Sequence, residues 1–102
     1  MRELQFRVPR TCDLAQAEPL IERVCGERGL QLGMKGTQSK FPGSIHWNFK
    51  RPRQKGTLEL TLLIPEQRIW AQVQDGRKAP WIDDELPVLQ RTIEKGLKSL
   101  AS

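Results

Sequence analysis

The sequence has few of the residues that build metal centres and redox sites. It contains one histidine, His46, and two cysteines, Cys12 and Cys25, which form no CxxC pair. A single histidine excludes a histidine-rich metal site, and we expect neither a metal nor a cofactor. A disulfide between the two cysteines is open from sequence alone, but a domain of this size in a reducing cytoplasm favours two free, buried thiols.

Long apolar runs are also absent. A transmembrane helix needs about 18 or more consecutive apolar residues, and no stretch of this chain approaches that length. The first ten residues, MRELQFRVPR, lack the apolar core of about 7–15 residues that marks a secretory signal. We therefore expect a cytoplasmic protein with no membrane partner.

Acidic residues are missing from a long internal segment. The whole chain carries 17 Lys and Arg against 12 Asp and Glu, a formal net charge of +5. Between Glu27 and Glu59, however, every charged residue is basic: Arg28, Lys35, Lys40, Lys50, Arg51, Arg53 and Lys55. Such a concentration of positive charge attracts anions, although a solvated, solubilising face explains the same pattern.

The chain has the composition of a folded domain. Of its 102 residues, 37% are hydrophobic and 28% are charged. A domain of this length buries about two-thirds of the surface that its unfolded chain exposes, which suffices for one core. We expect a single α+β domain over residues 1–102.

The segment 44–74 carries the clearest secondary-structure signal. Apolar and polar residues alternate over 44–50, 58–64 and 68–74, and short turns rich in Pro and Gly separate these three runs. This pattern predicts three antiparallel strands connected as a meander.

Two further alternating segments predict the remaining strands. Leu4, Phe6 and Val8 share one side of a strand over 3–8. The strand over 30–36 contains two glycines, which weaken a strand and often mark a bulge. Its GxxxGxxG pattern follows a helix instead of connecting a strand to a helix, so we expect no phosphate-binding loop there.

A first helix is predicted over 14–28. Asp13 is a typical N-cap, and Gly29 stands where a left-handed residue ends a helix. Pro19 leaves two alternatives. Either the helix is bent at this proline, or residues 13–17 form a separate turn and the main helix begins near Pro19.

A second helix is predicted to begin near 83–85 and to end near Leu100. Acidic residues are favourable at the N-terminal end of the helix dipole, and Pro87 would then fall in the first turn. We expect residues 76–81 to form a loop, with either Trp81 or Ile82 packing against that turn.

The element order β-α-β-β-β-β-α favours two layers. We expect a five-stranded antiparallel sheet in the spatial order 1-5-4-3-2, with both helices on one face. This order of elements resembles the TATA-binding-protein-like fold and is also similar to a shortened helix-grip domain. The first resemblance implies that two copies join through the edge strand 3–8.

One hypothesis is that the sheet face without helices binds nucleic acid or another polyanion. Basic side chains there would contact phosphates, Trp70 would stack on a base, and amides would read base edges. The predicted contact residues are Arg7, Lys35, His46, Asn48, Lys50, Arg51, Arg53, Lys55, Arg68, Trp70 and Gln72.

A second hypothesis, which we prefer, is a non-catalytic interaction or self-association module. The strands 3–8 and 30–36 are predicted sheet edges, and an exposed edge readily pairs with another chain. A homodimer through an edge strand is therefore an expected partner arrangement.

Catalysis and small-molecule binding are the remaining alternatives. The reactive residues are His46, Cys12, Cys25, Asp75 and the pair 83–84. Each has a simpler explanation as a surface, core or capping residue, although a thiolate at Cys12 could be favoured near a helix start. We assign no catalytic residue, and a ligand could instead bind between the sheet and the helices.

Overall fold

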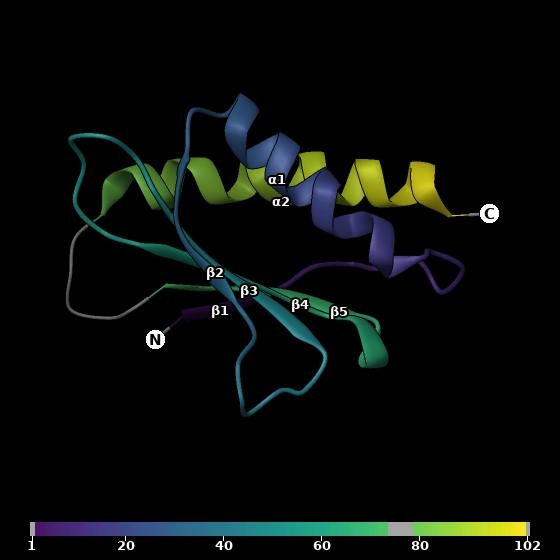
Figure 1. The fold of residues 1–102 in the computed structure, drawn as a ribbon. Helices are drawn as coiled ribbons and strands as arrows, with labels where there is room; N and C mark the ends of the chain where they lie inside the picture. Colours follow the sequence, from purple (N-terminus) through teal and green to yellow (C-terminus); the bar gives the residue numbers. More distant parts are fainter. Residues whose placement is uncertain (1, 74–78, 102) are drawn as a thin grey trace.

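The computed structural model describes residues 2–73 and 79–101 and has two layers (Figure 1). A five-stranded antiparallel sheet with the order β1-β5-β4-β3-β2 forms one layer, and two helices cover one of its faces. The strands are β1 (Arg2–Gln5), β2 (Gln31–Gly36), β3 (Ser44–Lys50), β4 (Leu58–Leu63) and β5 (Arg68–Val73). The helices are α1 (Ala17–Glu27) and α2 (Pro80–Leu100). The predicted α+β class and strand order are confirmed.

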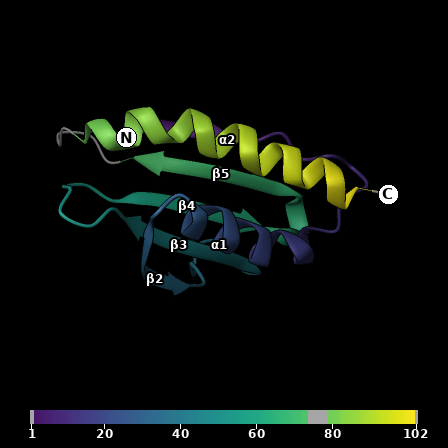
Figure 2. The same cartoon turned by 90° about the horizontal axis from the view of Figure 1, so that it is seen from above.

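The main core lies between the sheet and the helices. Leu58, Leu60 and Leu62 of β4 all point into it and are 0% exposed. Seen from above, α2 lies over β5 and α1 over β3 (Figure 2). The two helices approach so closely that a Cβ at Gly96 would lie 2.6 Å from a Leu20 methyl carbon. Burial contributes about 1.5–3 kcal/mol for each leucine, so β4 anchors the fold.

The first helix begins later than the preferred prediction. Residues Leu14–Gln16 form a 3-10 turn, which Asp13 caps by accepting a hydrogen bond from the Ala15 amide. The α-helix starts at Ala17, which places Pro19 in its first turn. Because a first-turn residue needs no hydrogen-bonded amide, proline is tolerated there. The continuous helix over 14–28 is wrong, and the alternative with a separate turn is correct.

The bounds of the predicted first strand and the start of the predicted second helix also shift, whereas the second helix ends at Leu100 as predicted. Strand β1 spans Arg2–Gln5, and the Phe6 amide beyond it still donates to the Ile69 carbonyl of β5. The Arg7 amide donates to the Glu94 carboxylate of α2. Helix α2 begins at Pro80, so Trp81 is a buried helical residue and Pro87 lies inside the helix. The predicted loop over 76–81 therefore ends before Pro80, and residues 74–78 lie outside the described part of the chain.

A second, smaller core lies on the opposite face of the sheet. The segment 37–43 between β2 and β3 passes beneath the sheet (Figure 1) and brings Phe41 against Trp70, with their ring centroids 5.2 Å apart. The Arg68 guanidinium stacks on the same indole at 4.7 Å. Trp70 is consequently 2% exposed, and Leu63 beside it is also 2% exposed. The prediction that this whole face is open is wrong.

Replacing Trp70 by alanine should therefore destabilise the protein. Removing a buried aromatic side chain costs about 3–5 kcal/mol, because it leaves a cavity and loses its packing contacts. Urea unfolding followed by far-ultraviolet circular dichroism measures this loss. Trp70→Phe, which keeps an aromatic ring against Phe41, is the matched control and should lose clearly less. A Trp70→Ala protein as stable as the wild type would contradict the burial of this face.

Candidate functional site

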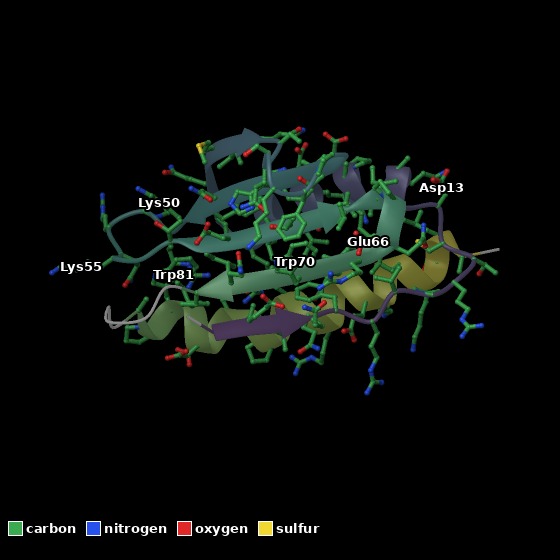
Figure 3. All side chains as sticks on the ribbon, turned by 90° about the horizontal axis from the view of Figure 1, so that it is seen from below. Asp13, Lys50, Lys55, Glu66, Trp70 and Trp81 are labelled. Atoms are coloured by element: carbon green, nitrogen blue, oxygen red, sulfur yellow. The ribbon has the colours of Figure 1, made fainter. Side chains whose placement is uncertain are left out.

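Figure 3 views the sheet from the face away from the helices, with Trp70 near its middle. The strand register places one row across the middle of this face: Gly36, His46, Thr61, Trp70 and Gln5. It places a second row nearer the β3–β4 turn: Met34, Asn48, Glu59, Gln72 and Glu3. Three residues of the first row, His46, Thr61 and Trp70, are buried, and Phe41 of the segment 37–43 packs on Trp70. The second row is partly exposed and contains two carboxylates. The face is therefore not the basic surface that we predicted.

His46 belongs to the first row and is 5% exposed. Its Nδ1 lies 2.8 Å from the Thr61 hydroxyl, and its Nε2 lies 3.1 Å from Glu59 Oε1. A carboxylate oxygen accepts, so a proton on Nε2 would donate to Glu59 while Nδ1 accepts from the Thr61 hydroxyl. With Trp70 buried beside it, the predicted contact of His46 and Trp70 with a partner would require displacement of the segment 37–43.

The Glu59–His46–Thr61 chain has the connectivity of a carboxylate–base–nucleophile triad. Catalysis of that kind needs the nucleophile to reach a substrate carbonyl. The Thr61 side chain lies in the middle of β4 and is 1% exposed. The chain of hydrogen bonds is therefore a buried polar network that satisfies three cross-strand neighbours, and it gives no support to an enzyme.

Lys35 lies on the helix side of the sheet, which corrects its predicted place on the open face. The register slips by one residue at Gly33, so Lys35 faces Trp47 and Met34 faces Asn48. Lys35 Nζ contacts Glu18 at 2.5 Å and Glu22 at 2.6 Å on α1. These carboxylates raise the pKa of Lys35, so its ammonium group stays protonated. The two carboxylates balance this positive charge at the sheet edge.

Arg7, Arg68 and Gln72 lie apart from one another. Arg7 follows β1, Arg68 is engaged with Trp70 and lies 3.7 Å from Glu66, and the Gln72 side chain donates to Glu3. No single phosphate track connects them. Their predicted roles in binding a polyanion remain predictions, but the residues do not form one site.

The β3–β4 turn carries the remaining predicted cations. Lys50, Arg53 and Lys55 are exposed, and among the described residues no carboxylate forms an ion pair with them. Arg53 has a left-handed backbone with φ of 66°. The Trp81 indole fixes the turn by donating to the Lys55 carbonyl at 2.7 Å. Figure 3 shows Lys50 and Lys55 at one end of the sheet.

Arg51 is not part of this exposed group, because it is held by Glu85. The Glu85 carboxylate is 3% exposed and accepts from both Arg51 and Arg28, the latter through Nε at 2.6 Å. The Arg51 guanidinium also stacks on Trp81 at 5.3 Å. Burial alone would raise the pKa of Glu85, but the two arginines outweigh it and hold that pKa below its ordinary value. This cluster ties the β3–β4 turn to both helices.

Cys12 and Cys25 are free and buried, as expected. Burial raises the pKa of Cys25 to about 12, and burial together with Asp13 raises the pKa of Cys12. A raised pKa disfavours the thiolate that the position of Cys12 near a helix start could have favoured. Within residues 2–73 and 79–101, no three His, Cys, Asp or Glu side chains gather as a metal site would require. Asp75 lies outside the described residues.

The hollow between the sheet and α2 is small. It has a volume of about 180 Å³ and is lined by Glu3, Leu4, Ala71, Val73 and Leu86. Ligand pockets commonly measure about 300–1,000 Å³. This hollow therefore offers little support for the alternative of a small molecule bound between sheet and helices.

The edge position of β2 was predicted, but the exposure of its apolar side chains is the feature that sequence reasoning missed. Every residue of Gln31–Gly36 is exposed, and it carries the large exposed hydrophobic side chains Leu32 at 50% and Met34 at 54%. In the sequence, Leu30, Leu32 and Met34 alternate with Gln31, Gly33 and Lys35, and this alternation alone predicts a core position for Leu32 and Met34. The glycines of this strand did indicate a bulge. They did not indicate on which face of the sheet the residues beside the bulge would lie. The buried Oδ1 of Asn48, next to Met34, accepts no hydrogen bond from the described residues.

Comparison with protein-family models, curated proteins and solved structures finds no significant match to this chain. Among the described residues, no helix is both long and apolar enough to cross a bilayer. The function must therefore be argued from the surfaces of the molecule itself.

The Glu85 cluster makes stability depend on acidity in a defined direction. Because the folded pKa of Glu85 is lowered, its contribution is fully present above the unfolded value of about 4.3 and is lost as the pH falls through the folded value. Glu85→Gln should cost about 1–3 kcal/mol at neutral pH, with the partly exposed arginines keeping the loss moderate. The difference from wild type should shrink on acidification.

Urea unfolding at a series of pH values measures this difference. Glu66→Gln is the matched control, because its carboxylate is 61% exposed and lies 3.7 Å from Arg68. A surface ion pair of that kind contributes little. An equal loss of stability in both variants, or a Glu85→Gln deficit that does not change with pH, would contradict the role assigned to the cluster.

Proposed function

We propose that this protein is a non-catalytic interaction module whose docking element is the free edge of β2. The observation that carries the proposal is the exposure of Leu32 and Met34 on that strand. Among the described strands, β2 has a neighbour only on its β3 side. An unpaired strand edge binds an extended partner through backbone hydrogen bonds, while alternate side chains provide specificity.

The charges around β2 support this role. Natural edge strands often avoid pairing by presenting an unpaired lysine. Lys35 is the only charged residue of β2, and it is drawn toward α1 by Glu18 and Glu22. A strand approaching this edge therefore meets backbone groups and two apolar side chains without an unpaired charge.

The opposite edge is less suited to docking. Strand β1 has four residues against six in β2. Its Glu3 is exposed and occupied by hydrogen bonds from Gln5 and Gln72. A charged, short edge is typical of strands that resist pairing. Of the two predicted edges, β2 is the one that we propose to bind a partner.

Met34→Asp should weaken strand binding at this edge, because it places a carboxylate where an apolar side chain meets the partner. The probe is a displayed library of random eight-residue peptides, selected on wild-type protein immobilised at low density. Peptides with alternating apolar residues should be enriched, and their affinity for Met34→Asp should fall about tenfold or more, equivalent to about 1.4 kcal/mol.

Thr92→Glu, which adds a charge on the exposed side of α2, is the control and should bind like wild type. Enriched peptides that bind wild type and Met34→Asp equally would contradict the proposal. So would a selection without enrichment on a wild-type protein that is monomeric.

A second candidate function, polyanion binding, is favoured by the β3–β4 turn. Lys50, Arg53 and Lys55 lie together at one end of the sheet, and the turn is fixed by Trp81 and Arg51. Anchoring the turn reduces the backbone freedom that is lost when its exposed cations bind an anionic partner. This surface replaces the larger basic face expected from sequence.

Removing these three charges should weaken nucleic-acid binding and its salt dependence. The variant combines Lys50→Gln, Arg53→Asn and Lys55→Gln, because asparagine tolerates the left-handed backbone at residue 53. Fluorescence anisotropy with mixed-sequence single- and double-stranded oligonucleotides should show the salt slope falling by about two to three units.

The matched control removes the same charge from the exposed side of α2 through Arg91→Gln, Lys95→Gln and Lys98→Gln. This control variant should keep most of the salt dependence of oligonucleotide binding. Equal losses in the two triple variants would show non-specific attraction to net charge, and no binding by wild type at low salt would also reject this function.

A further inference from the structure

We infer that the strand added to β2 is the β2 of a second copy of this chain, antiparallel and centred between Gly33 and Met34. This inference rests on the proposed function of the β2 edge and names its partner. In this register Gln31 lies opposite the partner copy's position 36, position 32 opposite 35, and position 33 opposite 34.

The face on which each β2 residue lies defines this register. Pairing with β3 places Leu32 opposite Phe49 and Lys35 opposite Trp47, which are both buried on the helix side. The same pairing places Gln31, Met34 and Gly36 on the other side, opposite Lys50, Asn48 and His46. Gly33 is the extra residue at the register shift. The sequence of faces along β2 is therefore the same when read in either direction from the point between Gly33 and Met34.

Directly opposed residues of antiparallel strands share a face of the sheet. The register centred between Gly33 and Met34 satisfies this condition over the whole strand, from Gln31 to Gly36. A centre at Gly33 would oppose Leu32 and Met34, which lie on different faces, and a centre at Met34 would oppose residues 33 and 35. Of these three centres, the one between the two residues fits the full length of β2.

The side chains are complementary in the same register. Met34 is 54% exposed, and it would lie across from a glycine that leaves room for it. Leu32 is 50% exposed, and it would lie across from the aliphatic part of Lys35, whose ammonium group reaches toward α1. Both exposed apolar side chains of the strand would thus be covered by the partner copy, on opposite faces of the joined sheet.

The charges favour a second copy over a charged peptide. Each Lys35 already contacts two carboxylates of its own chain. An acidic peptide would find no free cation on β2. The net charge of +5 on each copy would not place an unpaired charge at the interface between two β2 strands. The two Lys35 residues would be about 10 Å apart along the strands, at about 3.4 Å per residue, and each would remain neutralised.

Pairing of this kind joins two five-stranded sheets into one continuous sheet. The two-fold axis runs perpendicular to the sheet, so the helix layers of both copies lie on the same side and α1 of each copy flanks the junction (Figure 2). Such a closed, isologous arrangement gives a dimer and not a fibre, because each copy uses its β2 edge once.

Sedimentation equilibrium across the micromolar range tests the dimer. Wild type and the Thr92→Glu control should dimerise, and Met34→Asp should have a dimer dissociation constant at least tenfold higher. Circular dichroism should show that Met34→Asp keeps the wild-type fold, since residue 34 is exposed. A dimer that persists unchanged in Met34→Asp would overturn the inference.

Disulfide trapping tests the register independently. Gln31→Cys combined with Gly36→Cys should yield a covalent dimer on mild oxidation, because each new thiol faces the other position in the partner copy. Neither change alone should do so, and a Cβ at position 36 meets no atom within 4 Å. Efficient trapping of Gln31→Cys alone would overturn this register.

The dimer and the docking function fail in distinguishable ways. A monomeric wild type that binds selected peptides through Met34 would overturn the homodimer and leave the docking edge intact. A monomeric wild type that selects no peptide would reject both.

Discussion

The fold depends on the burial of β4 from both sides. Its leucines at 58, 60 and 62 pack under the helices, while Thr61 and Leu63 are covered from the opposite side. A strand buried on both faces cannot be shifted by one residue without placing Thr61 in the main core. This constraint fixes the register of β3 and β5, and through them the positions of both sheet edges.

The single-residue slip at Gly33 decides what the outer edge presents. It turns Lys35 toward Glu18 and Glu22 on α1, where a cation is neutralised. It also leaves Met34 on the other face, beyond the reach of the segment that covers Trp70. A bulge often protects an edge strand by twisting it away from partners. In this chain the bulge instead removes the protective charge from the edge, which is why β2 is the centre of the proposed function.

The sequence allowed the fold class, the strand order and the meander over 44–74 to be predicted, because alternation and turn residues are local signals. Element boundaries were less accurate, since distant residues act there. The Arg7 amide just beyond β1, for example, donates to Glu94, which lies 87 residues away. The prediction that the second sheet face is open was wrong for a related reason. Nothing near Trp70 in the sequence indicates that Phe41 will cover it, and a loop that packs against a distant strand leaves no periodic pattern. The edge residues Leu32 and Met34 looked like core residues, because alternation alone cannot show on which side of a glycine the register shifts.

The packing of Phe41 against Trp70 has a consequence for β2 as well as for the covered face. The segment 37–43 begins where β2 ends, and it is anchored beneath the middle of the sheet, with a Cβ at Gly43 lying only 2.9 Å from Pro65. The C-terminal end of the edge strand is thus tied to the interior, while its N-terminal end continues from the tight turn that closes α1 at Gly29. An edge fixed at both ends is preorganised: a strand that joins it orders little of this chain, and most of the interaction energy is retained as affinity.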